Sequence, residues 1–259
     1  IFVVLFVIGL SYAVFFSPVF QVEYIEVKGN QKVSTESIQE FAAPLLQRKF
    51  LFFRVNNLFL LDSGSIQEQV SYAFPAVETV SVERKFPDSV VLGFTERKGV
   101  AIWCSKKIYT VEASDAAKGE QRSFELCFSL DQTGLIFEKK EEKDKVVIAF
   151  ADNEIDVLLG EKIIDEGLLQ TILGFQRELD GFPLFQGIGL RVSSLHVISP
   201  DRVHAEISEG WEVYFNPTEN VEWQITKLKL VLEREIPFEK RASLEYIDLR
   251  FGDQAYIKY

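Results

Sequence analysis

Three kinds of hydrophobic pattern follow one another along the first part of the chain. Residues 1–16 are almost wholly apolar, and no charged residue precedes Glu23. Residues 22–27 then alternate apolar and polar side chains, which is typical of a half-buried strand. Two short amphipathic helices are predicted next, one beginning at the N-cap signal Ser34 and one at residues 62–65. The pattern therefore predicts an apolar helix followed by a small mixed unit.

A β-hairpin is expected to close this mixed unit. Residues 77–84 and 90–97 both alternate in polarity, and Phe86-Pro87-Asp88 lies between them as a turn signal. The predicted order is strand, helix, helix, strand, strand. Two helices can cover only one face of a three-stranded sheet, so the other face and one sheet edge remain available to partners.

From about Lys98 onward the pattern changes to short strands with two helices. The helices are predicted at 166–179 and from Pro217-Thr218 onward, where apolar residues recur at helical spacing. The charged stretch 138–145 is interpreted as a solvated turn. Two final strands, 244–251 and 254–259, flank a Gly-Asp turn. Further strands are expected at 100–104, 107–111, 124–130, 146–150, 190–198, 203–207 and 211–215. The fold class is thus α+β, ending in a mixed sheet with packed helices.

The apolar segment is interpreted as an N-terminally truncated transmembrane helix over 1–19. About 20 apolar residues are needed to cross the core of a bilayer, and the chain begins at Ile1 with no methionine anywhere. A cleaved signal peptide is the alternative, but it would need small residues at its cleavage site, where this chain has the bulky residues 15–20. A buried core helix is disfavoured because the segment has no polar face.

Composition limits the possible partners and the chemistry. The formal net charge of −11 argues against nucleic acid or an anionic bilayer surface as the main partner. Two cysteines, Cys104 and Cys127, are too few for a disulfide scaffold or a four-cysteine zinc site. A single bridge between them is permitted outside the cytoplasm, and two free buried thiols are the alternative. We predict that they pair across neighbouring strands.

Candidate catalytic and metal-binding residues are few. His196 and His204 lie in successive predicted strands, where a metal pair is conceivable, but no nearby cysteine completes it. Acid groups such as Asp152/Glu154/Asp156 and Glu141/Glu142 could do glycosidase chemistry but are more simply a solvated face. No Gly-rich phosphate loop, G-x-S-x-G elbow or H-E-x-x-H helix is present. We therefore expect no cofactor and no catalytic activity.

Several stretches resemble the bacterial cell-division family FtsQ/DivIB. The stretches 20–22 and 25–30 resemble the opening strand of a POTRA domain, and 77–97 resembles its closing hairpin. Leu130-Asp131-Gln132-Thr133-Gly134-Leu135-Ile136-Phe137 and Tyr246-Ile247-Asp248-Leu249-Arg250-Phe251 resemble stretches of the family's second domain. The resemblance implies a POTRA domain over 20–97 and an FtsQ/DivIB β-domain over 98–259.

The resemblance also implies a function. Such proteins sit in the cytoplasmic membrane with the N-terminus inside and the bulk of the chain outside, and they act at the division septum. They bind FtsB-like and FtsL-like bitopic proteins and help to regulate septal cell-wall synthesis, while the POTRA domain contacts other divisome components. The last strands are associated with FtsB binding. We therefore predict a partner-binding site made of Arg250, Phe251, Gln254, Ala255, Tyr256, Ile257, Lys258 and Tyr259.

The physical pattern of these residues favours the same role. A terminal strand is expected at a sheet edge, and an edge can pair with an added strand from a partner. Aromatic and arginine side chains there are typical interface anchors, although they could instead pack on their own sheet. Two other functions remain open: a POTRA-type transport or assembly component, and a membrane-tethered cell-wall enzyme with a convergent polar pocket.

Overall fold

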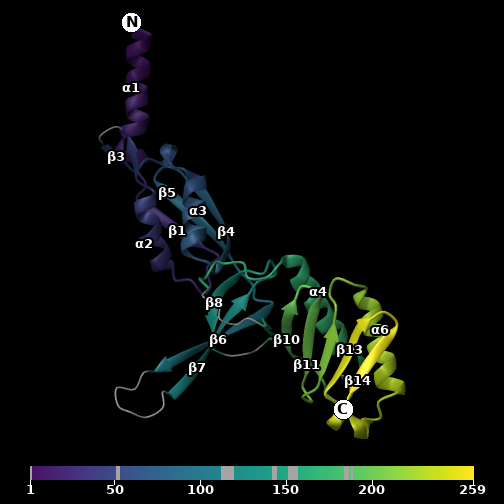
Figure 1. The fold of residues 1–259 in the computed structure, drawn as a ribbon. Coiled ribbons are helices and arrows are strands. Elements are labelled where there is room, and N and C mark those ends of the chain that lie inside the picture. The colour runs from purple at the N-terminus through teal and green to yellow at the C-terminus, as the bar shows by residue number, and fades with distance from the viewer. Residues whose placement is uncertain are drawn as a thin grey trace. The chain divides into compact units, whose positions relative to one another are not determined.

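A computed structural model describes the chain except for residues 1, 51–52, 112–119, 142–144, 151–156, 184–186 and 188 (Figure 1). The described residues form two compact units, Ile1–Arg97 and Lys98–Tyr259. The first unit begins with helix α1 (Phe2–Phe16), followed by the 3-10 helix η1 (Pro18–Phe20). Among the described residues, no helix combines the length and the apolar character that a membrane crossing requires.

The rest of the first unit has the predicted order, with a small hairpin inserted. Its elements are β1 (Tyr24–Lys28), α2 (Thr35–Leu45), β2 (Arg48–Phe50), β3 (Phe53–Val55), η2 (Leu58–Leu60), α3 (Ser63–Ala73), β4 (Val77–Lys85) and β5 (Ser89–Glu96). β1 pairs in parallel with β5, which pairs antiparallel with β4. β2 and β3, which were not predicted, pair with each other as a separate two-stranded sheet in the described residues.

The helices cover one face of the three-stranded sheet. Val90, Leu92 and Phe94 alternate along β5 and are buried against apolar residues of α2 and α3. Both helices begin as predicted, because Ser34 and Asp62 accept backbone N–H groups of their first turns. Glu96 fixes the loop before α2, since one of its oxygens accepts the backbone N–H groups of residues 31–33 at 2.6, 2.7 and 3.1 Å.

The second unit is a mixed sheet with two long helices. Its elements are β6 (Ala101–Val111), β7 (Glu120–Leu130), β8 (Ile136–Lys140), β9 (Val147–Phe150), α4 (Glu166–Asp180), β10 (Val192–Ser199), β11 (Arg202–Ile207), β12 (Glu212–Phe215), α6 (Val221–Arg234), η3 (Phe238–Ser243), β13 (Tyr246–Phe251) and β14 (Gln254–Lys258). In the described residues the strand order is β14-β13-β12-β11-β10-β9-β6-β7-β8. α4 and α6 lie beside the β10–β14 part of the sheet (Figure 1).

The core of this unit lies between the helices and the sheet. Phe175 of α4 stacks on Phe215 of β12 with ring centroids 3.8 Å apart, and both side chains are fully buried. Trp103 of β6 is buried in the same core, whereas its neighbours Ile102 and Cys104 belong to a separate small cluster. This alternation follows from the two-residue period of a strand.

Three details differ from the sequence prediction. The charged stretch 138–145 is not wholly a turn, because β8 continues to Lys140 and pairs with β7. The strands predicted at 100–104 and 107–111 are one strand, β6. The last long helix begins at Val221 rather than Pro217, because Asn220 accepts the backbone N–H of Trp223 and caps the helix.

Candidate partner-binding site

The C-terminal hairpin forms one edge of the large sheet. β13 pairs in parallel with β12 and antiparallel with β14, and β14 is outermost. Gly252 makes the turn with φ +49°, a conformation that glycine adopts without steric cost. One side of the β14 backbone therefore faces away from the sheet, where a strand from another chain could pair with it.

The two faces of β14 differ. The side chains of Gln254, Tyr256 and Lys258 are exposed, whereas Ala255 and Ile257 are half-buried against the core of the unit. All five residues belong to the predicted site. At Ala255 and Ile257 the side chain serves the protein's own core, so a partner could use only the backbone there.

Aromatic rings dominate the exposed part of the hairpin. Phe251 and Tyr256 are each 51% exposed, and their rings meet edge to face at 5.1 Å. The Tyr256 hydroxyl donates to Gln254 Oε1 at 2.8 Å, and Tyr259 is 49% exposed just beyond β14. The predicted Phe251 and Tyr256 are thus brought together, and all three predicted aromatic side chains are open to solvent. Large exposed rings of this kind are favourable anchors for a partner.

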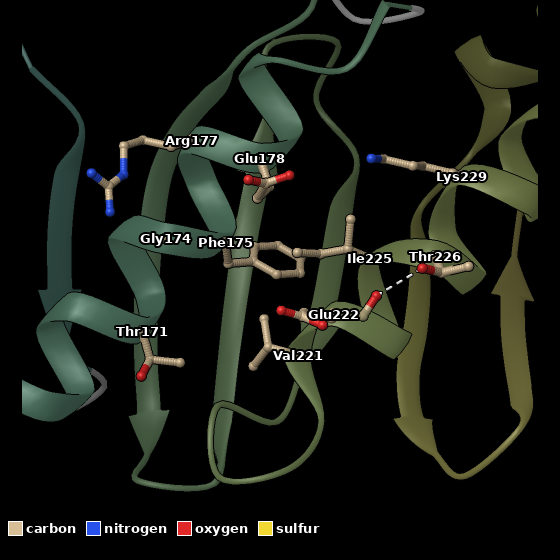
Figure 2. A pocket seen from close by; sticks show the side chains of 10 residues that line it. All are labelled: Thr171, Gly174, Phe175, Arg177, Glu178, Val221, Glu222, Ile225, Thr226 and Lys229. Carbon is tan, nitrogen blue, oxygen red and sulfur yellow. Dashed lines mark hydrogen bonds between the residues drawn. The ribbon is translucent and has the colours of Figure 1, made fainter.

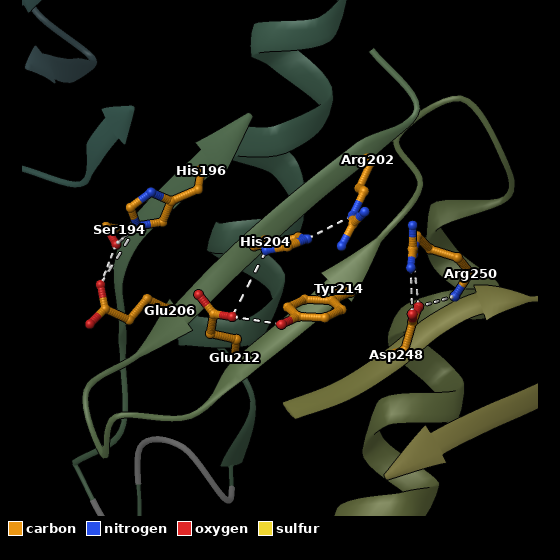
Figure 3. Close-up of polar contacts among 9 residues, drawn as sticks. All are labelled: Ser194, His196, Arg202, His204, Glu206, Glu212, Tyr214, Asp248 and Arg250. Atoms are coloured by element: carbon orange, nitrogen blue, oxygen red, sulfur yellow. Dashed lines mark hydrogen bonds and ion pairs between the residues drawn. The ribbon is translucent and has the colours of Figure 1, made fainter. Parts of the chain in front are cut away.

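The predicted arginine is already paired within the sheet. Arg250 Nε donates to Asp248 Oδ1 at 2.9 Å and Nη2 donates to Asp248 Oδ2 at 2.6 Å (Figure 3). This bidentate contact raises the pKa of the Arg250 guanidinium. The guanidinium also lies 5.6 Å from the centroid of Phe251, so Arg250 orients the aromatic edge. Lys258 pairs with Glu245 at 2.7 Å.

A buried lysine on α6, which the sequence analysis did not identify, supports the β13–β14 hairpin through hydrogen bonds from the helix side of the sheet. Lys227 Nζ donates to the carbonyl oxygens of Leu249 and Gly252, each at 2.6 Å, and of Gln254 at 3.2 Å. Burial lowers the pKa of this ammonium. Trp223 Nε1 adds a hydrogen bond of 3.1 Å to Asp253 Oδ1. The sequence signal that could have indicated this role is the position of Lys227 beside the apolar face of the helix.

A row of polar and aromatic side chains runs across β10–β13 beside this edge (Figure 3). His204 stacks on Tyr214 at 3.7 Å, and Tyr214 stacks on Tyr246 at 4.6 Å. Arg202 Nε donates to His204 Nε2 at 2.9 Å, which requires a neutral imidazole. Burial lowers the pKa of His204 to about 4, and burial with the Glu212 hydrogen bond raises that of Tyr214 to about 12.

The His204 pKa predicts a pH dependence of stability. The unfolded chain takes up a proton near the ordinary histidine pKa of 6.5, whereas the folded chain does so near 4. The free energy of unfolding is therefore expected to fall by about 1–3 kcal/mol as the pH drops from 6.5 to 4. Urea unfolding across this range measures it. His204→Gln should show a smaller fall, and an equal fall in both proteins would contradict the assignment.

The two histidines lie opposite each other in the backbone, but their ring nitrogens contact different groups. His196 and His204 are directly opposite in the β10–β11 ladder. Their Nε2 atoms contact different groups, Ser194 Oγ at 2.9 Å and Arg202 Nε at 2.9 Å. Within the described residues no three metal-ligating side chains come together. The acidic group Asp152/Glu154/Asp156 and Glu142 lie outside the described residues, and their role stays untested.

One cluster has the residue types of a hydrolase triad but not its geometry. Ser194 Oγ donates to Glu206 Oε2 at 2.5 Å and lies 2.9 Å from His196 Nε2. In a triad the acid would contact the other imidazole nitrogen and the serine would donate to the histidine. Here Glu206 lies 3.8 Å from the same Nε2. The sequence analysis did not predict the β10–β11 register that brings these three residues together.

A cavity lies between α4 and α6. Phe175 and Ile225 are at its centre, and Figure 2 shows charged side chains such as Arg177 and Glu178 around them. Thr226 Oγ1 donates to the Glu222 carbonyl at 2.9 Å, as expected for a threonine within a helix. Thr171 Oγ1 likewise donates to the Gly167 carbonyl at 2.9 Å, so both threonine hydroxyls that line the cavity are bonded to the backbone of their own helices rather than to a side-chain base.

Cys104 and Cys127 are joined in the structure. They face each other in the β6–β7 ladder, with sulfur atoms 2.10 Å apart. We expect a thiol titration of the unreduced, denatured chain to detect no free thiol, and two after reduction. Two reactive thiols before reduction would contradict the pairing.

Comparison with known families matches both units. Residues 20–97 match the POTRA domain, FtsQ-type, and residues 126–250 match the C-terminal domain of cell division protein FtsQ/DivIB. A comparison with curated protein sequences found no significant match. A POTRA domain of this type followed by this sheet domain defines a class of cell division protein. The chain belongs to the FtsQ/DivIB family.

Membership of the family carries a general function. It implies a role in cell division, in association with the membrane at the septum and with other division proteins. Proteins of the family are generally non-catalytic.

Proposed function

We propose that this chain is a non-catalytic scaffold of the division machinery that binds FtsB-like and FtsL-like bitopic proteins and thereby regulates septal cell-wall synthesis. The observation that carries the proposal is the edge position of β14, with Phe251 and Tyr256 exposed beside it. A partner strand added to this edge would gain main-chain hydrogen bonds, and the rings would select its side chains.

We further propose that α1 attaches the chain to the cytoplasmic membrane and that both units lie outside the cytoplasm. Two observations support this arrangement. The side chains of α1 are apolar and largely exposed, for example Phe2 at 89% and Val3 at 75%. The Cys104–Cys127 bridge is of a kind that persists in oxidising compartments. The POTRA unit is then free to contact other division proteins.

The test is binding of the intact chain, held in lipid nanodiscs, to the FtsB-like and FtsL-like proteins of its own host. A Phe251→Ser/Tyr256→Ser double variant should bind about tenfold more weakly or worse, because exposed aromatic anchors carry much of the energy of an interface. Tyr72→Ser is the matched control, since Tyr72 is 90% exposed on α3 of the other unit. A folded variant that ends after Gly252 should not bind.

Three outcomes separate the possibilities. Loss of binding in the hairpin variants alone supports the edge-strand mode. Equal binding by the parent and the double variant would place the contact elsewhere on the chain. Absence of binding by the parent would overturn the proposed partners and return attention to a transport or assembly role.

A further inference from the structure

Three phenylalanines from three separate segments meet on the surface of the first unit. Phe20 belongs to η1, Phe59 to η2, and Phe86 to the turn between β4 and β5. The ring centroids of Phe20 and Phe59 are 5.2 Å apart, and those of Phe59 and Phe86 are 5.4 Å apart. Phe59 is 42% exposed, Phe86 58%, and the adjoining Val19 56%. We call these four residues the phenylalanine patch.

The patch lies at the C-terminal end of α1. The buried side chain of Asn57 donates from Nδ2 to the carbonyl oxygens of Val14 at 3.0 Å and Phe15 at 3.1 Å, in the last turn of α1. Its Oδ1 accepts the backbone N–H of Phe59 at 2.8 Å. One asparagine therefore satisfies two otherwise unpaired carbonyls of α1 and also begins the short helix that carries Phe59.

A second polar contact holds the patch in place. Arg84, at the end of β4, donates from Nε to the Leu58 carbonyl at 2.9 Å and from Nη2 to the Leu61 carbonyl at 2.8 Å. The segment that carries Phe59 is thus fixed on both sides, and the exposure of its ring follows from a defined backbone. Single exposed apolar residues are ordinary, but a contiguous group of fixed rings indicates a contact surface.

The neighbouring helix indicates which partner this surface meets. α1 is apolar on all sides, and its described side chains are exposed apart from the half-buried Val14, with Phe6 at 70% and Leu10 at 55%. A helix without a polar face is stable only in an apolar surrounding, which lipid supplies when protein does not. The patch directly continues this apolar surface at the point where the helix ends.

We propose that the phenylalanine patch inserts into the interfacial layer of the lipid bilayer beside α1 and holds this end of the POTRA unit against the membrane. Apolar groups at such a depth are buried about 5–10 Å into the boundary between headgroups and acyl chains. The inference rests on the membrane attachment of α1 proposed above and adds a second lipid contact. Because Asn57 joins the patch to α1, both contacts would form together.

The test measures lipid contact at three positions of the full chain, reconstituted into vesicles of phosphatidylcholine and phosphatidylglycerol. Phe59→Trp reports the patch, Phe6→Trp reports α1, and Tyr72→Trp is the control. Tyr72 is 90% exposed and lies near the beginning of β4, whereas Phe86 directly follows the end of β4. A nine-residue strand is about 30 Å long, so position 72 is well separated from the patch. Lipids brominated near the headgroup end of the acyl chain report position 59, and lipids brominated near the middle of the acyl chain report position 6, because Phe6 lies about 15 Å along the helix from the end of α1. Position 72 is measured with both lipids, and the parent signal from the three native tryptophans is subtracted.

Quenching at position 59 is expected to be about threefold greater than at position 72, and adding Phe86→Glu to Phe59→Trp should abolish that difference, because a charge opposes interfacial burial. Quenching at position 6 without quenching at position 59 would overturn the patch proposal, and would leave a protein partner as the occupant. Equal quenching at 59 and 72 would overturn it too. No quenching at position 6 would instead contradict the attachment of α1 itself.

Discussion

Replacing Lys227 with methionine is expected to loosen the β13–β14 hairpin and weaken partner binding through it. Methionine keeps the packing of the side chain but leaves the carbonyls of Leu249, Gly252 and Gln254 without their shared donor. Unpaired buried polar groups cost about 1–3 kcal/mol, so the free energy of unfolding should fall by about 2–3 kcal/mol. Hydrogen exchange of the β14 amides should accelerate before global unfolding.

The matched control is Lys229→Met on the same helix. Lys229 lies 5.3 Å over the ring of Phe182 and is partly exposed, so its loss should cost less than about 1 kcal/mol and leave exchange in β14 unchanged. If Lys227→Met unfolds the unit globally, the slower-exchanging core strands will report it. Unchanged exchange in β14 of a folded Lys227→Met variant would show that the lysine does not position the edge.

Substituting alanine for Gly134 is expected to be among the most destabilising single changes in the second unit. Gly134 has φ +87°, and an added Cβ would lie 2.1 Å from the carbonyl oxygen of Ile164. The two segments cannot separate easily, because Ile163 N–H donates to the Gly134 carbonyl at 2.9 Å. Steric overlap and backbone strain together should lower the free energy of unfolding by about 3 kcal/mol or more.

The control variant Gly210→Ala separates steric overlap from backbone strain. Gly210 has φ +93° but nothing lies within 4 Å of an added Cβ, so this variant incurs backbone strain alone. Its cost should be about 1–2 kcal/mol. Chemical denaturation of both variants gives the comparison, and equal losses would mean that the close approach at Ile164 relaxes without cost.

The periodic elements could be predicted from the sequence because local pattern and tertiary environment agree there. The order of the first unit, α4, and the final hairpin were all visible as alternation or helical spacing bounded by turn residues. The predicted resemblance to the FtsQ/DivIB family is confirmed by the matches of both units. Boundaries failed where two signals competed. Pro217 suggested a helix start, yet Asn220 provided the side-chain cap.

The binding site was only partly predictable, because its contacts depend on tertiary neighbours. The sequence predicted a strand at 254–259 and the aromatic residues on it. The two-residue period of a strand could also have shown that Ala255 and Ile257 face inward. The support from Lys227 could not be found this way, since it joins groups at least 22 residues apart. The pairing of Ser194 with Glu206 likewise depends on a bulged register that no local pattern specifies.

The open edge at β14 has a consequence for the solubility of the protein when it is alone. An unpaired strand edge can join the same edge of another copy and seed aggregation. Short length and the exposed Lys258 oppose this, but Phe251 and Tyr256 favour it. A division partner bound at β14 would cover this aggregation-prone edge. By mass action it would also stabilise the folded chain. The amount of soluble protein in the cell would then depend on how much partner is made with it.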